Sequence, residues 1–455
     1  MISKENIIKI LVLLLLFAPL FFYKLGQTSL ISWDEAWYAD VSRNIINTGD
    51  LFNLSWNGMP FSDKPPGGFW LEAISFKILG VSEFSARLPS AVAGVLSLYL
   101  IYLLGNKLFN KLTGILSISA LVSSPWFLYR SRVGDLDSLL TFFYLLTLYL
   151  AYLARENKKF LIPFCLSLAY LPMIKGVVFV GAVIPSLLII FWGNKIYKVK
   201  DYLLALFLSF GFFGTWILVQ YLNSPDLVRY HFSHSLRDSS FQSNILSNFQ
   251  VLKEYLHSGI GRWFWPGILG VIAGMLLKNK RIFTLSIFFF FYSLQFLLSP
   301  KIEIWHLIPL YPFMILCFFG SVFVFSKKFP RYQLSINTTV VIFTLYVSLT
   351  QLRQMWYQFV DIPAFISDEA ILSREASKYS YPFYIDSSFE PAAVFYSGKE
   401  AKWVNEYYLA DLFKKSEPFV MIIKEPMLDK LKVDPKNYRI LKMDRDKSLI
   451  LYQPR

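Results

Sequence analysis

The chain has 455 residues, of which 55% are hydrophobic and 18% aromatic, and its mean hydropathy is +0.45. This composition excludes an ordinary soluble domain and indicates a membrane protein with many spans. The formal net charge is +14. However, Lys and Arg lie in short clusters between apolar runs, which indicates membrane topology rather than a surface for nucleic acid. Cys165 and Cys317 lie inside apolar runs, so we expect no structural disulfide.

A membrane span needs about 20 apolar residues. The first apolar run has no small-residue cleavage site after it, so we interpret it as an uncleaved span. Segment 69–80 is short and polar, which favours an amphipathic helix in the membrane interface. Gly270 and Gly274 form a G-x-x-x-G pattern that is typical of helix packing. The eleven candidate spans are 7–25, 87–106, 112–129, 136–154, 160–174, 177–193, 202–221, 264–277, 282–298, 304–325 and 336–351.

Alternate connections between these spans carry clusters of cations. By the positive-inside rule these clusters lie in the cytoplasm, and an odd number of spans follows. The outer face of a bacterial inner membrane then receives the first loop, 26–86, and the C-terminal tail. The cations are Lys4 and Lys9; Lys107 and Lys111; Arg155, Lys158 and Lys159; Lys195, Lys198 and Lys200; Lys278, Lys280 and Arg281; and Lys327, Lys328 and Arg331.

The composition changes near residue 352. Residues 381–386, 418–424 and 447–452 predict short strands, and residues 405–415 and 425–432 predict short helices. The predicted fold is therefore an α-helical polytopic membrane domain over 1–351, with interfacial helices in its first loop. A small soluble α/β domain over 352–455 follows it on the outer, periplasmic face.

Two motifs of the first loop carry chemistry. Asp34 and Glu35 are adjacent carboxylates just past a span, suited to a general base and its support. The alternative is an acidic first turn of a solvated helix. Asp63 and Lys64 precede two prolines, which hold the backbone extended and can present the Lys64 ammonium to an anion. The alternative here is a proline-rich turn before a helix.

Charged residues also occur at the outer boundaries of later spans. Arg130, Arg132, Asp135 and Asp137 lie at the start of the span 136–154, and Lys175 interrupts two spans. Charges near hydrocarbon are costly, so such groups usually have partners and tasks. We expect Asp137 to belong to the catalytic set, where it orients a cation or the acceptor. The alternative for the arginines is that they anchor the helices at the interface.

Three further outer residues are candidates. Lys301 and His306 lie before a span, and His234 lies in the long outer loop. A lone histidine is more often a hydrogen-bonded structural residue than a ligand. The sequence contains no His-x-x-x-His or Cys-x-x-Cys spacing, so no cofactor is certain. A divalent metal held by Asp63 and His234, with help from Glu35, stays an open alternative.

The outside of a cell has no nucleotide-sugar pool, so chemistry there needs an activated donor that arrives in the membrane. A phosphorylated polyprenyl lipid fits this need. Lys64, Arg132, Lys301 or His306 would hold its phosphate and stabilise the charge that develops on it. An acceptor hydroxyl needs a carboxylate base such as Asp34 within hydrogen-bond reach.

The first loop resembles that of bacterial polyprenyl-phosphate sugar transferases with the GT-C membrane fold, including lipid A aminoarabinose transferases and relatives of the protein O-mannosyltransferases. The resemblance rests on WDEAWYADVSRNIINTGDLF and WNGMPFSDKPPGGFWLEAISFKILGVSEFSARLPSAVAG. It continues in order through RVGDLDSLLTFF, LAYLPMIKG, FSHSLRD and SPKIEIWHLIPLYP. It covers about residues 7–325.

The resemblance implies roles for two residues. Asp34 matches the catalytic or acceptor-positioning carboxylate, and Lys64 matches the lysine that contacts the lipid phosphate. Asp63 stands where the family commonly has Glu, and Trp37 stands at an arginine position, so one phosphate contact is missing. The family implies transfer with inversion from a polyprenyl-monophosphate sugar to a lipid, glycan or protein hydroxyl. The alternatives are a flippase for lipid-linked sugars and a structural membrane protein.

Overall fold

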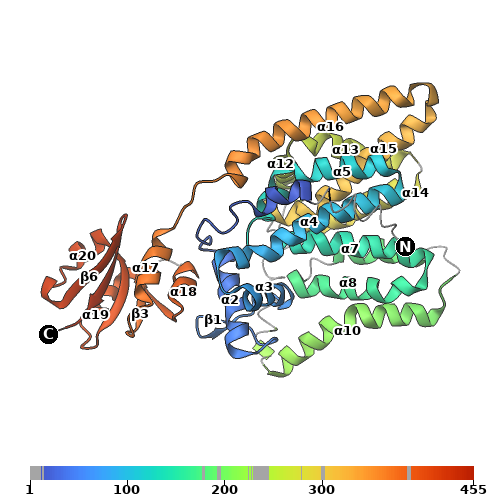
Figure 1. Cartoon of the computed structure of the whole chain (residues 1–455). Coiled ribbons are helices and arrows are strands. Elements are labelled where there is room, and N and C mark those ends of the chain that lie inside the picture. The colour runs from blue at the N-terminus through green and yellow to red at the C-terminus, as the bar shows by residue number, and fades with distance from the viewer. Residues whose placement is uncertain are drawn as a thin grey trace. The chain divides into compact units, whose positions relative to one another are not determined.

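The structure is a computed structural model of the chain. It describes residues 12, 15–176, 180–191, 196–223, 225–226, 228, 245–277, 279–298, 303–386 and 391–454. These residues are mostly helical and divide into two compact units (Figure 1). Unit 1 comprises residues 1–24, 62–68 and 87–362, and unit 2 comprises residues 25–61, 69–86 and 363–455. The first loop is thus divided between the two units.

Unit 1 is a bundle of apolar helices whose long members lie side by side (Figure 1). Its helices are α4 (Glu83–Leu108, which starts in unit 2), α5 (Lys111–Val122), α6 (Pro125–Arg130), α7 (Asp137–Glu156), α8 (Leu161–Lys175), α9 (Val180–Phe191), α10 (Val199–Asn223), α12 (Ile245–Ile260), α13 (Phe264–Leu276), α14 (Lys280–Leu297), α15 (Tyr311–Lys328) and α16 (Gln333–Met355). The 3₁₀ helix η4 (Ile304–Leu310) leads directly into α15.

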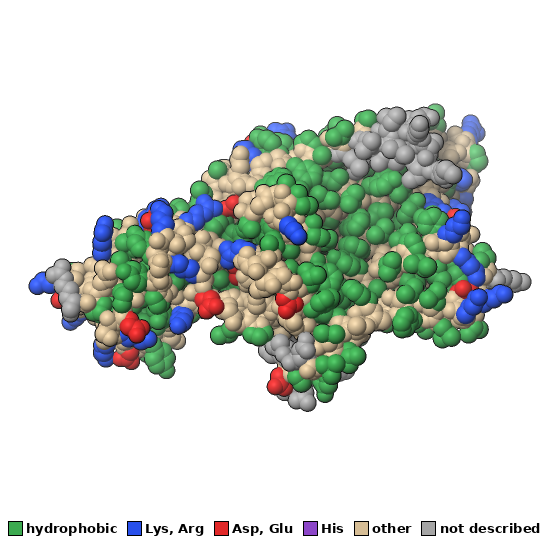
Figure 2. All heavy atoms as spheres, turned by 60° about the horizontal axis from the view of Figure 1, so that its bottom comes forward, with side chains coloured by type: hydrophobic (Ala, Val, Ile, Leu, Met, Phe, Trp, Pro, Cys, Tyr) green, Lys and Arg blue, Asp and Glu red, His purple; other side chains and the backbone are tan. Residues whose placement is uncertain are grey.

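Seven helical stretches among the described residues are long and apolar enough to cross a membrane. The protein is therefore a multi-pass membrane protein, and the predicted helical membrane fold is confirmed. The number eleven stays a prediction, because most of the first candidate span lies outside the described residues. In Figure 2, hydrophobic side chains cover the middle of the bundle, and Lys and Arg side chains gather at its right-hand end.

The predicted packing role of Gly270 and Gly274 is confirmed on α13. A Cβ atom on Gly270 would collide with the backbone of Phe318 on α15, and one on Gly274 would collide with the Ser286 hydroxyl on α14. The two glycines therefore allow α13 to lie against two neighbours at backbone distance. Cys165 and Cys317 are free and buried, as their apolar surroundings predict.

The C-terminal part of unit 2 is built on a five-stranded sheet in the order β4-β3-β5-β7-β6. Strands β4, β3 and β5 are parallel, whereas β7 is antiparallel to both β5 and β6. The elements are α17 (Asp368–Ala376), β3 (Phe383–Asp386), α18 (Pro391–Ser397), β4 (Ala401–Val404), α19 (Glu406–Leu412), β5 (Phe419–Lys424), α20 (Glu425–Leu431), β6 (Tyr438–Asp444) and β7 (Lys447–Tyr452).

The three predicted strands correspond to β3, β5 and β7, which are the strands with apolar runs. β5 and β7 are almost completely buried and contribute to hydrophobic clusters on both faces of the sheet. The sequence did not predict β4 and β6. Most β6 residues are exposed or half-buried, so its sequence, YRILKMD, lacks an apolar signal.

Part of the first loop belongs to unit 2 as well. It forms α2 (Asp34–Thr48), a two-residue hairpin of β1 (Ser55–Trp56) and β2 (Met59–Pro60), and most of α3 (Gly67–Leu79). The Arg43 guanidinium of α2 donates to the Phe395 carbonyl of α18 at 2.6 Å. Asn57 exchanges two hydrogen bonds with the backbone of Ala401. These contacts join residues 25–61 to the C-terminal sheet, although about 350 positions of sequence separate the paired residues.

Candidate functional site

Four charged side chains form a buried cluster, the charge cluster, at one end of unit 1. Arg130 ends α6, Asp137 begins α7 and Lys175 ends α8, while Asp135 lies in the turn between α6 and α7. Arg130 forms ion pairs with Asp135 and, at 3.1 Å, with Asp137. Lys175 forms an ion pair with Asp137 from the opposite side. The two cations and two acids therefore balance one another where water is scarce.

The turn before α7 is fixed by its own polar groups. The Asp135 carboxylate accepts a hydrogen bond from the Asp137 N–H at 2.9 Å. The Ser90 hydroxyl of α4 donates to the Asp135 carbonyl at 2.7 Å, and the Ser138 hydroxyl donates to the Ser90 carbonyl. These three hydrogen bonds fix the turn and with it the start of α7, from which the Asp137 side chain projects.

Asp135 lies outside the spanning segments and has an unusual protonation equilibrium. Burial removes its carboxyl from water and raises its pKa to about 8, although Arg130 acts in the opposite direction. The carboxylate of Asp137 adds to the increase, because two negative charges repel each other at short range.

Lys64 is brought to this end of unit 1 by the residues that follow it. Pro65 and Pro66 are buried and lead into Gly67, whose carbonyl accepts a hydrogen bond from the Tyr170 hydroxyl of α8 at 2.7 Å. A Cβ atom on Gly67 would lie 2.7 Å from the Met173 carbonyl oxygen, so only glycine permits this approach. The double proline and the glycine together seat the chain against α8.

His306 joins these groups into one electrostatic neighbourhood. Its imidazole interacts electrostatically with Lys175, Asp137, Lys64 and Arg130. Its Nδ1 atom accepts a 3.4 Å bond from the N–H of Glu303, with which it forms a capping box at the start of η4. The structure therefore brings together three predicted site residues, Lys64, Asp137 and His306, and gives the imidazole a structural contact as well.

The Lys64 ammonium is paired with the side chain of its neighbour. Its Nζ atom lies 2.6 Å from an Asp63 carboxylate oxygen, and both side chains are half-buried. This contact holds the ammonium close to the backbone while leaving part of it accessible. A phosphate group also accepts charge-assisted hydrogen bonds from an ammonium, so it can compete with the Asp63 carboxylate for the same donors.

Arg132 is engaged with the backbone. Its guanidinium donates to the carbonyls of Leu20, Tyr23 and Phe359 at 2.7–2.8 Å and to that of Val360 at 3.3 Å. Burial and the neighbouring Arg87 lower its pKa to about 10, so it stays charged at neutral pH. These bonds favour a structural role. The expectation that Arg132 holds phosphate stays a prediction.

Asp34 and Glu35 lie in the first turn of α2 in unit 2. Asp34 is half-buried, whereas Glu35 is buried and accepts a hydrogen bond from the Ile31 N–H at 2.8 Å. This bond closes the turn before the helix. The catalytic role of Asp34 and the supporting role of Glu35 stay predictions. Trp37, which occupies the family's arginine position, packs edge-on against Phe61 and Trp56.

Sequence reasoning missed two features. Glu72 on α3 is buried, and its carboxylate accepts a hydrogen bond from the Ser42 hydroxyl of α2 at 2.9 Å. The sequence feature that could have pointed to Glu72 is an acidic residue inside the apolar run GFWLEAISF. Trp305 faces the charge cluster, with the Arg130 guanidinium 4.8 Å from its ring centre. For Trp305, the only such sequence feature is its position directly before His306.

Two predicted residues, Lys301 and His234, lie outside the described residues. Their roles stay predictions. In the part of the chain that the structure describes, no three His, Cys, Asp or Glu side chains form a group that could hold a metal ion. Asp63 is described, and its carboxylate is bound to Lys64.

Residues 63–218 match the family described as dolichyl-phosphate-mannose-protein mannosyltransferase. An undecaprenyl phosphate-α-4-amino-4-deoxy-L-arabinose arabinosyl transferase of Pseudomonas fluorescens is 28% identical over 49% of this chain and 40% of its own length. An uncharacterized protein of Aquifex aeolicus is 32% identical over 47% of this chain and 44% of its own length. The chain thus spans less than half the length of these curated relatives.

Two solved structures share the fold. ArnT from Cupriavidus metallidurans bound to undecaprenyl phosphate superposes with a TM-score of 0.76 and 13% identity, over 99% of this chain and 98% of that one. The Archaeoglobus fulgidus oligosaccharyltransferase in complex with Zn and sulfate gives a TM-score of 0.60 and 13% identity, over 85% of this chain and 62% of that one. At these identities the likeness concerns the fold.

Proposed function

Because the chain belongs to the GT-C family of membrane glycosyltransferases, we propose that it transfers a sugar from a polyprenyl-monophosphate carrier. The acceptor is a hydroxyl group of a lipid, a glycan or a protein. The reaction takes place at the outer face of the bacterial inner membrane and inverts the anomeric carbon. The names of the arabinosyl transferase relatives and the undecaprenyl phosphate in the ArnT structure support this class of carrier.

The observation that carries the proposal is the shared neighbourhood of Lys64, His306 and the charge cluster. The phosphate group of the carrier lipid needs cationic hydrogen-bond donors. Because the carrier lies in the membrane, these groups must lie at an end of the helical bundle. Lys64 meets both needs as a cation, and His306, whose Nδ1 accepts a hydrogen bond and so carries no proton, offers its Nε2–H as a neutral donor. Asp137 holds Lys175 in the same neighbourhood. We assign phosphate binding to Lys64 and His306, with Lys301 and Arg132 as further candidates.

The proposed chemistry is a single displacement. The acceptor oxygen attacks the anomeric carbon, and the bond from that carbon to the phosphate oxygen breaks. The bonding electrons stay on the phosphate oxygen, so the carrier leaves as polyprenyl phosphate with an additional negative charge. Cationic groups stabilise this charge as it develops. We assign the acceptor proton to the Asp34 carboxylate, which Glu35 supports through the closed turn at Ile31.

A divalent metal remains an addition to this scheme and carries no step of it. Asp63 offers a carboxylate, but the pairing of that carboxylate with Lys64 is unfavourable for a metal ligand. Transfer that continues at full rate in a chelator would exclude the metal. Transfer that stops, and returns when a divalent cation is added, would establish it.

The experiment uses the full chain in lipid nanodiscs with polyprenyl-phosphate sugars and a membrane acceptor fraction. Release of free polyprenyl phosphate is followed for the wild type and for Lys64→Met. We expect Lys64→Met to slow release about 10- to 100-fold, because a hydrogen bond to a charged group contributes about 1.5–3 kcal/mol. Lys77→Met, which removes an exposed cation of α3, is the matched control and should keep the wild-type rate.

The same experiment separates the transferase from a flippase for lipid-linked sugars. A flippase moves the conjugate across the membrane and leaves the sugar–phosphate bond intact, so no free carrier forms. If the wild type releases no polyprenyl phosphate from any donor in the pool, the transferase proposal fails. If Lys64→Met and Lys77→Met release it equally fast, the assignment of Lys64 fails.

A further inference from the structure

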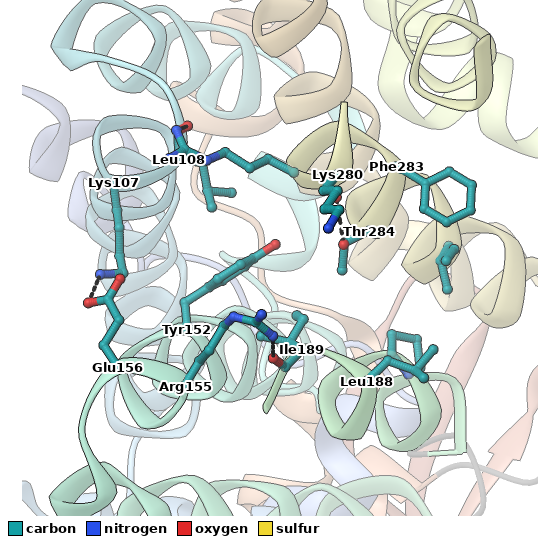
Figure 3. A pocket seen from close by; sticks show the side chains of 13 residues that line it. Lys107, Leu108, Tyr152, Arg155, Glu156, Leu188, Ile189, Lys280, Phe283 and Thr284 are labelled. Carbon is teal, nitrogen blue, oxygen red and sulfur yellow. Dashed lines mark hydrogen bonds and ion pairs between the residues drawn. The ribbon is translucent and has the colours of Figure 1, made fainter. Parts of the chain in front are cut away.

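A cavity lies at the end of unit 1 opposite to the charge cluster. It has a volume of about 630 Å³ and is lined by the C-terminal ends of α4, α7 and α9 and the first turns of α14 (Figure 3). Asp137 begins α7, whereas Arg155 and Glu156 end it. At 1.5 Å per residue, the two ends of this helix are about 28 Å apart. The cavity is therefore separate from the charge cluster and has no part in the proposed transfer.

The walls of this cavity have two chemical characters. Apolar side chains form one part of the cavity wall, and charged side chains form a rim around the cavity. The rim has four cations and one acid, so its formal charge is +3. The apolar residues are Leu108, Pro185, Leu188, Ile189, Phe283 and Ile287, and the charged residues are Lys107, Arg155, Glu156, Lys280 and Arg281.

The cations of the rim are held in place by the surrounding helices. Lys107 is paired with Glu156 at 2.7 Å, so these two charges offset each other. Arg155 donates to the Ile189 carbonyl (Figure 3). Arg281 donates to the Leu108 carbonyl. Each guanidinium has five N–H donors, so such a bond orients the group and leaves it able to bind an anion.

The N-terminus of α14 does not supply this recognition. The Asn279 side chain already accepts hydrogen bonds from the N–H groups of Arg281 and Ile282. Side chains must therefore bind the anion, chiefly those of Lys280 and Arg281, which are exposed at the rim. Thr284 and Tyr152 also line the cavity.

We propose that this cavity is a second lipid-phosphate site, which holds the phosphate of a membrane lipid at Lys280, Arg281 and Arg155. The hydrocarbon chain of the lipid packs against Leu188, Phe283 and their apolar neighbours. The volume of the cavity lies in the usual range for ligand sites. The position of the cavity at the end of membrane helices places its charged rim at headgroup level. A soluble anion would gain nothing from the apolar wall, which is why a lipid fits better.

The position of the rim agrees with the topology predicted from the sequence. Lys107, Arg155 and Lys280 belong to clusters that the positive-inside rule assigns to the cytoplasm. The site would therefore take a lipid from the inner leaflet, on the side opposite to the proposed transfer. A polyprenyl phosphate and an anionic phospholipid share the phosphate and the chain, and the experiment distinguishes them.

The test uses the full chain in phosphatidylcholine nanodiscs and a polyprenyl phosphate with a photoreactive group beside the phosphate. Cross-linked peptides are mapped by mass spectrometry. We expect labelling in residues 280–287. Lys280→Gln/Arg281→Gln should reduce it about tenfold or more, since each charge-assisted bond contributes about 1.5–3 kcal/mol. Lys327→Gln/Lys328→Gln, which removes two cations of α15 outside the cavity lining, should leave labelling unchanged.

A second variant keeps the cations and removes the space. Thr284→Trp fills the cavity and should also prevent labelling of residues 280–287, while thermal unfolding shows whether each variant remains folded. Equal labelling in the wild type, Lys280→Gln/Arg281→Gln and Thr284→Trp would overturn the proposal. Equal labelling by the corresponding polyprenol, which lacks the phosphate, would overturn it too.

Competition identifies the source of the phosphate. If unlabelled polyprenyl phosphate displaces the probe and phosphatidylglycerol does not, the ligand is the carrier lipid. If phosphatidylglycerol displaces the probe as well, the site takes anionic membrane lipids in general. Displacement by neither contradicts the proposal. The probe carries no sugar, so the result is independent of whether the protein transfers one.

Discussion

The Lys175 ammonium and the Asp137 carboxylate form an ion pair inside unit 1, although the residues lie 38 positions apart in the sequence. Lys175 is the last residue of α8, and Asp137 is the first residue of α7. Their side chains are only 11% and 1% exposed. The pair thus fixes the ends of two neighbouring helices, and it holds a cation within electrostatic range of His306.

Breaking this pair from one side should destabilise the protein. Lys175→Met leaves Asp137 buried with Arg130 as its remaining ion-pair partner at 3.1 Å. Removal of one partner from a buried pair typically costs 3–5 kcal/mol, so we expect a loss of about 3 kcal/mol in the free energy of unfolding. The double variant Lys175→Met/Asp137→Asn keeps the Arg130–Asp135 pair and should recover at least about 1 kcal/mol of it.

Denaturant unfolding in detergent measures this double-mutant cycle. Lys378→Met removes one partner of an exposed pair with Glu375 in unit 2 and serves as the control. It should change the free energy of unfolding by less than about 1 kcal/mol. Additive effects of Lys175→Met and Asp137→Asn would show that the two side chains are not coupled.

Arg132→Gln should act on stability more than on transfer. The substitution removes the guanidinium from its part-buried hydrogen bonds to the carbonyls of Leu20, Tyr23 and Phe359, and a hydrogen bond to a charged group contributes about 1.5–3 kcal/mol. We expect a loss of about 3 kcal/mol or more in unfolding free energy. The rate per folded molecule should stay within about twofold, because no transition-state contact is lost. A tenfold higher KM for the donor at unchanged stability would instead support phosphate binding by Arg132.

Asp34→Asn and Glu35→Gln should separate catalysis from support. A positioned general base contributes roughly 10²- to 10⁴-fold, so we expect Asp34→Asn to lower kcat by that factor at unchanged stability. Glu35→Gln weakens the bond from the Ile31 N–H and should lower stability by about 1 kcal/mol, with a smaller loss of rate. Steady-state release of polyprenyl phosphate and thermal unfolding measure the two effects. Equal losses of rate in both variants would contradict separate roles.

Glu72 should make the stability of unit 2 dependent on pH. Burial raises the pKa of its carboxyl well above the usual range, the Ser42 hydroxyl acts in the opposite direction, and the nearby Glu35 raises the pKa further. A raised pKa in the folded state means that the contribution to stability is present at low pH. It is lost as pH rises from the ordinary glutamate pKa through the raised value.

Glu72→Gln should therefore flatten the pH profile. One proton corresponds to a slope of about 1.4 kcal/mol per pH unit, which the variant should lack. We expect the variant to unfold less readily than the wild type at pH 8 and similarly at pH 4. Glu417→Gln, an exposed acid of the same unit, should leave the profile unchanged. Parallel profiles for wild type and Glu72→Gln at all pH values would contradict this reading.

Features that depend on neighbours in the sequence were predictable. The apolar runs indicated the spans that α4 and α7 now form, because a helix satisfies its backbone hydrogen bonds within the segment. The short apolar runs FVMIIK and KSLILY indicated β5 and β7, and the structure buries both strands. Asp137 stood out because a carboxylate at the edge of an apolar run needs a partner.

The partner itself was not predictable. Lys175 was visible as a cation between spans, but its pairing with Asp137 depends on α8 packing against α7. Arg132 is a different case: its charge at an outer boundary led us to expect a phosphate contact, which stays a prediction, while its guanidinium binds backbone carbonyls. A charge near a membrane boundary signals that a partner exists, and only the packing says whether that partner is a ligand or the chain.

The sequence by itself determined the membrane class, the apolar helices, the strands with buried runs and the residues with chemistry to offer. These follow from local hydrogen bonding and from the cost of exposing apolar surface to water. The tertiary structure alone decided that Lys64 shares a neighbourhood with His306, that residues 25–61 pack with the C-terminal sheet, and that a basic cavity lies beyond α7. Such contacts join residues far apart in the chain, and their energies depend on distances that no local pattern encodes.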